Sequence, residues 1–132
     1  MESSIFIHIP LYQYHTAWEL AFDEETHACR DEYKGNAFGI KHEGIASPNA
    51  DNGFFEIIKK LDSTKTVVCG HEHINDFSIE YEGVRLTYAV KCGPGCYWEK
   101  ELNGGTKLSI DSKGDVVLEH IFITPEELGY SF

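Results

Sequence analysis

Two short apolar runs predict buried strands. Residues 4–9 (SIFIHI) are mostly β-branched or aromatic, and the run ends at Pro10, which cannot donate to a strand ladder. Residues 64–69 (TKTVVC) form a second run of the buried type, directly before Gly70. We therefore expect both segments inside a sheet.

Four further segments predict two β-hairpins. Residues 77–81 alternate between apolar and polar side chains, Glu82-Gly83 follows as a turn, and residues 84–90 return as a strand. Residues 106–110 and 116–123 form a second pair around a polar, glycine-containing turn. The second half of the chain is therefore expected to be mainly β-structure.

Apolar periodicity predicts two helices, at about residues 16–22 and 53–61, the second capped by Asn52. Residues 34–52 are rich in Gly, Asn, Ser and Pro and predict a long ordered loop. The expected apolar face of the second helix consists of Phe54, Ile57, Ile58 and Leu61. This order of elements predicts one α+β or mixed α/β unit over residues 1–132.

The composition is that of an acidic globular protein. Of the 132 residues, 42% are hydrophobic and 13% aromatic, enough to fill a core, and the formal net charge is −11. Such a charge repels phosphate backbones, so we expect no nucleic-acid partner. No apolar run approaches the roughly 20 residues that cross a bilayer, so we expect no membrane partner. An acidic enzyme still binds phosphate when metal cations lie at its site.

The N-terminus and the cysteines indicate a cytoplasmic protein. The segment MESSIFIHIP has no basic region, and its apolar stretch is too short for a secretion signal. A Gly-Pro-Gly turn could bring Cys92 and Cys96 together, but Cys29 and Cys69 form no second close pair for a zinc site. We therefore expect four reduced cysteines.

Three histidines lie where the predicted buried strands end. His71 and His73 follow the run at residues 64–69, and His8 lies near the end of the run at residues 4–9. Ligands bind at the carboxyl ends of strands in α/β sheets, and imidazole binds Zn, Fe, Mn and Cu. The alternatives are a hydrogen-bonded core histidine for His8 and an exposed polar loop for His71 and His73. The pattern favours a metal site.

Longer motifs surround these histidines. They are His8-Ile9-Pro10-Leu11 with Tyr14 and Trp18, Glu43-Gly44-Ile45, Asn52-Gly53-Phe54-Phe55, and Gly70-His71-Glu72-His73-Ile74-Asn75-Asp76-Phe77. Together they resemble the C-terminal half of a calcineurin-like metallophosphoesterase of the purple-acid-phosphatase-like branch. The resemblance extends from the first strand to about Trp98.

This resemblance implies a two-metal hydrolase built on a β-sandwich with flanking helices. By the resemblance, His8 and His71 would bind one metal ion and His73 the other, with Fe, Mn or Zn as the metal. Metal ions roughly 3.5–4 Å apart in such a site hold a hydroxide that attacks phosphorus. The implied activity of the intact domain is hydrolysis of a phosphate monoester.

The chain lacks the other ligand motifs of that family. Asp-x-His, Gly-Asp-x-x-Asp and Gly-Asn-His-Asp/Glu precede the His8 position in the family and are absent here. Three neutral imidazoles supply no charge to hold two dications. We therefore expect residues 1–132 to be the C-terminal part of a metallophosphoesterase domain without its N-terminal metal-binding half. Such a part would be inactive alone, with no certain catalytic residue, and would bind at most one metal ion weakly.

Four polar residues are further candidates around the site. His42 and Glu43 lie near where the resembling enzymes place substrate-facing groups, while Asn75 and Asp76 follow the histidines and could orient a ring. The remaining histidines are expected on the surface or in structural roles: His15, His27 and His120.

Removal of half a domain uncovers a sheet edge and an apolar face, so we expect a homo-oligomer formed through that edge. Two other functions stay open. The chain could be a non-catalytic module derived from the same fold, with one bound metal ion or none. It could also be a regulatory or interaction subunit whose missing ligands come from a partner.

Overall fold

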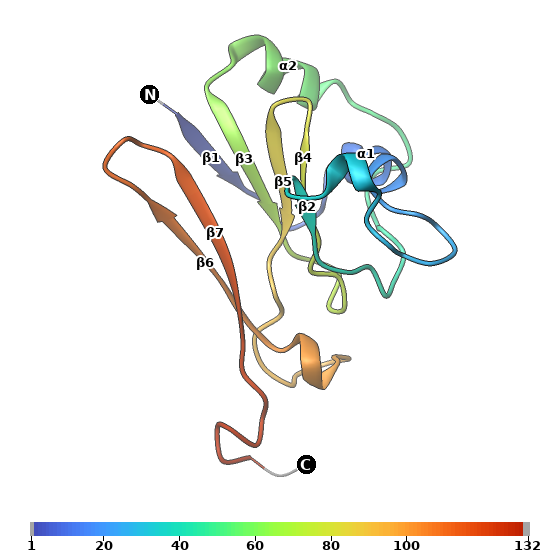
Figure 1. Ribbon diagram of the computed structural model, residues 1–132, viewed down its shortest axis with the longest axis vertical. Coiled ribbons are helices and arrows are strands. Elements are labelled where there is room, and N and C mark those ends of the chain that lie inside the picture. Colours follow the sequence, from blue (N-terminus) through green and yellow to red (C-terminus); the bar gives the residue numbers. More distant parts are fainter. Residues whose placement is uncertain (1, 131–132) are drawn as a thin grey trace.

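A five-stranded mixed sheet forms the centre of the molecule in the computed structural model, which describes residues 2–130 (Figure 1). Its strand order is β1-β3-β5-β4-β2. The first three strands in this order run parallel, and β4 is antiparallel to both β5 and β2. The bounds are β1 Ser3–Phe6, β2 Ala37–Phe38, β3 Thr64–Cys69, β4 Ser78–Tyr81 and β5 Val84–Tyr88.

Two helices cover one face of this sheet. They are α1 (Gln13–Ala21) and α2 (Phe54–Leu61), and two 3-10 turns at Asp31–Tyr33 and Lys100–Leu102 complete the helical structure of the described residues. The core between helices and sheet is aromatic, with Tyr14 and Trp18 of α1 buried against Phe77. The Tyr14 hydroxyl also donates to the carbonyl of Val67 at 2.9 Å, which fixes α1 on the sheet.

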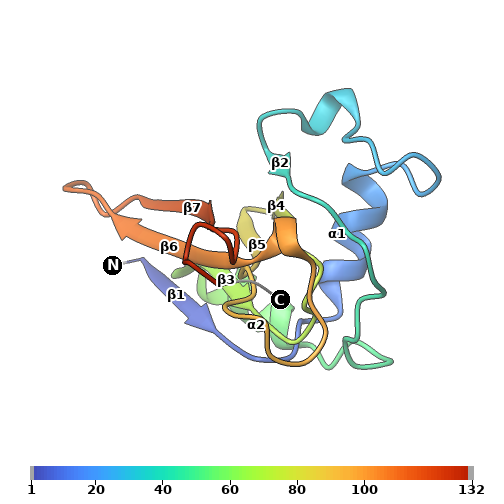
Figure 2. The same cartoon turned by 90° about the horizontal axis from the view of Figure 1, so that it is seen from below.

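A hairpin of β6 (Gly104–Ile110) and β7 (Val116–Phe122) lies on the opposite side of the sheet from the helices (Figure 2). One chain of hydrogen bonds ties it to the sheet layer. The Val90 amide donates to Thr106 Oγ1 at 2.9 Å, this hydroxyl lies 2.9 Å from His120 Nδ1, and His120 Nε2 donates to the Asp76 carbonyl at 2.6 Å. Sheet and hairpin form two layers, which confirms the predicted mixed α+β fold as a partial sandwich.

The first strand differs from its prediction. β1 ends at Phe6, so His8 lies in the loop beyond it, and β1 is an edge strand with β3 on one side only. Phe6 is 65% exposed, whereas Val67 of β3 is fully buried. The prediction of a buried strand was wrong for β1 because an apolar run does not reveal whether a second layer covers both of its faces.

The second helix lies where it was predicted, but it presents a different face to the core. Phe55 and Ile58 are its buried side chains, whereas Ile57 and Leu61 are exposed. The N-cap residue is Gly53, in a left-handed conformation, and Asn52 Oδ1 accepts the amide of Phe54 at 3.0 Å. Asn52 thus closes the turn that leads into the helix without being the cap residue.

The remaining differences are small. The first helix begins three residues earlier than predicted, at Gln13, and the predicted loop at residues 34–52 contains β2, which pairs with β4. The run at residues 64–69, the Glu82-Gly83 turn and the second hairpin are confirmed. No helix within residues 2–130 combines the length and the apolar character that crossing a bilayer requires.

Candidate metal centre

The candidate centre lies where the parallel strands β1 and β3 end. Phe6 pairs with Val68 in the register of the two strands, and the loops that follow stay in contact. The amide of Ile7 donates to the Val68 carbonyl at 3.0 Å, and the amide of Gly70 donates to the His8 carbonyl at 3.1 Å. This continuation of the ladder brings His8 next to the loop that carries His71 and His73.

His8 and His71 face each other across this junction. His8 Nε2 lies 3.2 Å from His71 Nδ1, and the two rings meet edge to face with 5.0 Å between their centroids. Two imidazole nitrogens that bind one zinc ion at about 2.1 Å with tetrahedral geometry lie roughly 3.4 Å apart. At this distance one ring can donate a hydrogen bond to the other when no metal ion is bound, and the same spacing fits two ligands of a single metal ion.

The turn at this junction depends on His71 rather than on Gly70. His71 has a φ of 78°, in the left-handed region, whereas Gly70 is not among the residues with positive φ. A Cβ built at Gly70 would lie 3.6 Å from His8 Nδ1, an ordinary contact. A glycine is thus not required at position 70 for the close approach to His8. The left-handed conformation, which is unfavourable for residues other than glycine, is instead adopted by His71, a candidate ligand.

His73 is held by the segment that follows β5. Its Nδ1 donates to the Tyr97 carbonyl at 2.8 Å, and the Tyr97 ring stacks on the imidazole with 4.1 Å between centroids. A carbonyl accepts only, so in the neutral ring the lone pair lies on Nε2, the nitrogen free to bind a metal ion. Within residues 2–130, however, no three His, Cys, Asp or Glu side chains form a group that could hold a metal ion. The role of His73 as a ligand stays a prediction.

Glu43 connects the segments around His73. Its Oε1 accepts the amides of His73 at 2.6 Å and Ile74 at 2.9 Å, while its Oε2 accepts the Tyr97 hydroxyl at 2.8 Å. Burial and the hydrogen bond to Glu43 raise the pKa of Tyr97. The carboxylate therefore fixes the histidine loop and the Tyr97 segment relative to each other.

Asn75 and Asp76 bind backbone rather than a ring. Asn75 Oδ1 accepts the amides of His42 at 3.0 Å and Glu43 at 3.1 Å, and Asp76 Oδ1 accepts the Ile40 amide at 2.6 Å. Both side chains are buried. They attach the segment around residue 42 to the strand end that carries the histidines.

Two other residues of this neighbourhood show how closely the segments approach. His42 Nδ1 lies 2.7 Å from Glu99 Oε2, at the surface. A Cβ at Gly39, whose φ is 90°, would come within 2.6 Å of Phe77 Cα and 2.7 Å of the Asp76 carbonyl oxygen. Only glycine fits where this segment crosses the end of the sheet.

A buried polar cluster lies beneath the histidine loop. Glu72, between the two loop histidines, is 4% exposed, and its Oε1 accepts the Ala46 amide at 2.5 Å. Its Oε2 and the hydroxyl of Tyr88 are both buried without a hydrogen-bond partner in the described chain. Burial raises the pKa of the Tyr88 hydroxyl and that of the Cys69 thiol. Through the Ala46 amide, the Glu72 side chain ties the histidine loop to the segment around residue 46.

The remaining histidines lie apart from this pair. His15 Nε2 donates to the Ile45 carbonyl at 3.0 Å, and His27 contacts the edge of Trp18. His120 belongs to the hydrogen-bond chain under the hairpin. All four cysteine thiols are free.

Sequence reasoning missed three residues that shape the site: Glu72, Tyr97 and Glu99. Glu72 lies between the two histidines of the motif, and this position next to both candidate ligands was a signal in the sequence that could have identified it. Tyr97 and Glu99 lie several residues beyond the end of the first hairpin. Only the folded path of that segment brings Tyr97 to His73 and Glu99 to His42.

Comparisons with known proteins agree with the motifs. No family model matches the chain, and no solved structure matches it. The chain is 30% identical over 99 residues to "Probable inactive purple acid phosphatase 29" of Arabidopsis thaliana, covering 72% of this chain and 22% of that protein. It is 29% identical over 89 residues to "Probable inactive purple acid phosphatase 14" of the same plant, covering 67% of this chain and 19% of that protein.

The chain thus spans about a fifth of the length of the curated relatives it matches. The matched part is nevertheless most of the chain itself, and the predicted resemblance is confirmed. Over this part, the chain is homologous to the purple acid phosphatase-like proteins.

Proposed function

We propose that this chain is part of a metallophosphoesterase-type domain and that His8 and His71 bind one divalent metal ion weakly. The observation that carries the proposal is the 3.2 Å separation of His8 Nε2 and His71 Nδ1, which suits two ligands of one ion. His8 is exposed and His71 half-buried, so an ion can reach both nitrogens from solvent.

The donor set explains why the binding would be weak. Two neutral imidazoles bring no negative charge, and carboxylate ligands are what normally balance the charge of a dication. Zn, Mn and Fe are all compatible with imidazole ligands. A metal ion bound here would supply Lewis-acid stabilisation of phosphate oxygens and a water of lowered pKa. The contribution of this chain is to orient two rings, through the β1–β3 ladder and the buried Glu72 carboxylate.

We propose further that the chain alone does not hydrolyse phosphate esters. Both relatives are named as probable inactive phosphatases, which supports a non-catalytic role. A second function, hydrolysis of a phosphate monoester by a metal-activated water, would need further ligands from the rest of a longer domain or from a partner. The homology to phosphatase-like proteins favours this second function only for such a completed domain.

Titration calorimetry with Zn²⁺ and Mn²⁺ tests the metal site. The variants are His71→Asn and His27→Asn, a matched pair because both histidines have positive φ, 78° and 56°, which asparagine tolerates. We expect one weak site in the wild type, roughly tenfold or more weaker binding in His71→Asn, and unchanged binding in His27→Asn. The same ions with an aryl phosphate should give no turnover.

Two outcomes would contradict this function. Equal losses in both variants would show that the ion binds elsewhere. Turnover of the aryl phosphate by the chain alone, abolished by His71→Asn, would show that the two-histidine site is itself catalytic.

A further inference from the structure

Two Asn-Gly steps occur in the chain, Asn52-Gly53 and Asn103-Gly104, and the fold places them in opposite surroundings. An asparagine before a glycine can lose its side-chain amide without an enzyme. The next backbone nitrogen attacks the side-chain carbonyl carbon, and glycine has no Cβ that hinders this approach. The hydrogen bonds and the burial of each step decide whether the folded chain allows the reaction.

Asn52-Gly53 lies at the surface, in the loop that leads into α2. Asn52 is exposed, and a Cβ built at Gly53 would meet nothing within 4 Å. Gly53 has a φ of 77°, in the left-handed region that glycine adopts without strain. The step therefore has open space around it, and water can reach the asparagine side chain.

The side-chain carbonyl of Asn52 faces the start of a helix. Its Oδ1 accepts the amide of Phe54, the first residue of α2, at 3.0 Å. Negative charge develops on this oxygen when the carbonyl carbon is attacked. A backbone amide within about 3.1 Å stabilises such a charge, and the positive end of the helix dipole adds to the effect. The turn thus holds the carbonyl in a polarised state.

The attacking nitrogen also has a suitable partner. The amide of Gly53 donates to Asp51 Oδ1 at 2.9 Å. This amide loses its proton when its nitrogen bonds to carbon, and a general base acts from about 2.6–3.2 Å. The other oxygen of Asp51 accepts Gln13 Nε2 at 2.8 Å, which holds the carboxylate in place. Asp51 is therefore positioned to take the proton.

Asn103-Gly104 has the opposite arrangement. Asn103 is 4% exposed, its Oδ1 accepts the amide of Gly93 at 2.8 Å, and its Nδ2 donates to the Ile123 carbonyl at 2.9 Å. The Gly104 amide donates to the Lys91 carbonyl at 2.9 Å, which is a neutral acceptor and not a base. The side chain is fixed at both ends, so loss of its amide would break the hydrogen bonds that join these segments.

We propose that Asn52 is a site of spontaneous deamidation in the folded protein, with Asp51 as the base. The Gly53 nitrogen forms a bond to Asn52 Cγ, the Cγ–Nδ2 bond breaks, and ammonia leaves with the proton taken from the Gly53 amide. One water molecule then opens the cyclic imide at either carbonyl, which gives aspartate or isoaspartate at position 52. The reaction does not involve the candidate metal centre, so the proposal stands or falls separately from the proposed function.

The two products affect α2 differently. Aspartate keeps an oxygen that can accept the Phe54 amide, and its negative charge is favourable at the start of a helix. Isoaspartate adds one carbon to the backbone directly before α2, whose Phe55 and Ile58 are buried in the core. We therefore expect the isoaspartate form to have a lower Tm, whereas Asn52→Asp should keep the Tm of the wild type.

Peptide mapping by mass spectrometry during incubation near neutral pH tests the proposal, because deamidation replaces an NH group by oxygen and changes the peptide mass. In the folded chain we expect Asn52 to react roughly tenfold or more faster than Asn103. In urea the two steps should react at similar rates, since both are then unprotected Asn-Gly sequences. Equal rates at the two sites in the folded chain would overturn the proposal.

Two variants test the role of the carboxylate. Asp51→Ala should slow the reaction at Asn52 roughly tenfold or more. Glu56→Ala is the matched control, because it removes another carboxylate near the start of α2, one that pairs with Lys59 instead, and should leave the rate unchanged.

Circular dichroism of each variant, together with the rate at Asn103 in the same sample, separates loss of the base from loosening of the fold. A loosened fold would speed the reaction at Asn103. An Asp51→Ala variant that deamidates at Asn52 as fast as the wild type, or faster, would overturn the proposal. So would a Glu56→Ala variant that slows the reaction as much as Asp51→Ala does, since charge alone would then explain the effect.

Discussion

Glu43 is the single side chain on which the arrangement around His73 depends most. Its carboxylate accepts two backbone amides of the histidine loop and the Tyr97 hydroxyl. The resemblance to a known family marked Glu43 and Asn75 from the sequence, because both lie within recognisable motifs. It could not mark Tyr97, which lies outside those motifs and meets His73 through a backbone carbonyl, which any residue type supplies, and through ring stacking that depends on the folded path of the chain.

Glu43→Ala should destabilise the protein by about 1–3 kcal/mol, because it leaves two loop amides without their acceptor. Tyr97→Phe is the matched variant, since it removes only the third hydrogen bond of the same carboxylate and should cost about 0.5–1.5 kcal/mol. Urea unfolding followed by circular dichroism measures both. A Glu43→Ala variant no less stable than Tyr97→Phe would show that solvent replaces the carboxylate at the loop amides.

Elements were predictable from the sequence where the signal is local. The buried run of β3, the turn at Glu82-Gly83 and the position of α2 depend on neighbouring residues alone. The burial of β1 and the inward face of α2 were not predictable in the same way. Both depend on which face a second layer covers. In α2 the apolar residues are spread so widely around the helix that either of two rotations about its axis would turn an apolar face toward the core. β2 is too short, at two residues, to leave a pattern.

The rotation of α2 can be tested with two adjacent isoleucines. Ile58 is 3% exposed and packs in the core, whereas Ile57 is 54% exposed. Ile58→Ala should destabilise the protein by about 2–5 kcal/mol, and Ile57→Ala by less than about 1 kcal/mol, as measured by chemical unfolding. Helix propensity changes equally in the two variants, so the difference between them reports burial. Equal losses would mean that α2 is rotated so that both side chains are partly covered.

The whole molecule is a helix-covered sheet with a second, much smaller layer. The helix side is packed with large apolar side chains such as Tyr14, Trp18 and Leu86. The other side presents small hydroxyl residues, Thr66, Ser78 and Thr87, beneath a two-stranded hairpin. Alternation at residues 77–81 predicted that the two faces of β4 would differ, but the position of the hairpin over one face depends on long-range hydrogen bonds through His120. No local pattern carries that information.

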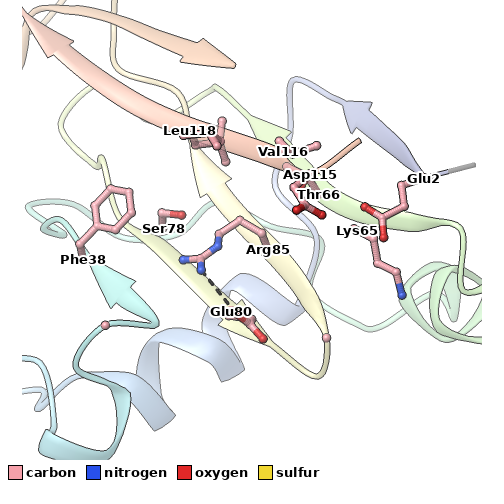
Figure 3. Close-up of a pocket in the computed structure, with 13 residues that line it drawn as sticks. Glu2, Phe38, Lys65, Thr66, Ser78, Glu80, Arg85, Asp115, Val116 and Leu118 are labelled. Atoms are coloured by element: carbon pink, nitrogen blue, oxygen red, sulfur yellow. Dashed lines mark hydrogen bonds and ion pairs between the residues drawn. The ribbon is translucent and has the colours of Figure 1, made fainter. Parts of the chain in front are cut away.

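This asymmetry predicts two levels of local stability, which amide hydrogen exchange can resolve. The central strands β3 and β5 are buried on the helix side and paired on both edges, so their amides should exchange only through global unfolding. Apart from the Gly104 amide, which donates to the Lys91 carbonyl at 2.9 Å, the ladder of β6 and β7 joins these two strands to each other alone among the described residues, and they lie beside an open cavity between hairpin and sheet (Figure 3), so their amides should exchange faster by local opening. His120→Ala removes the hydrogen bond to the Asp76 carbonyl and should speed exchange in the hairpin while β3 stays slow. If β6 and β7 are instead as slow as β3 at low protein concentration, the hairpin is an integral part of the core and the two layers unfold together.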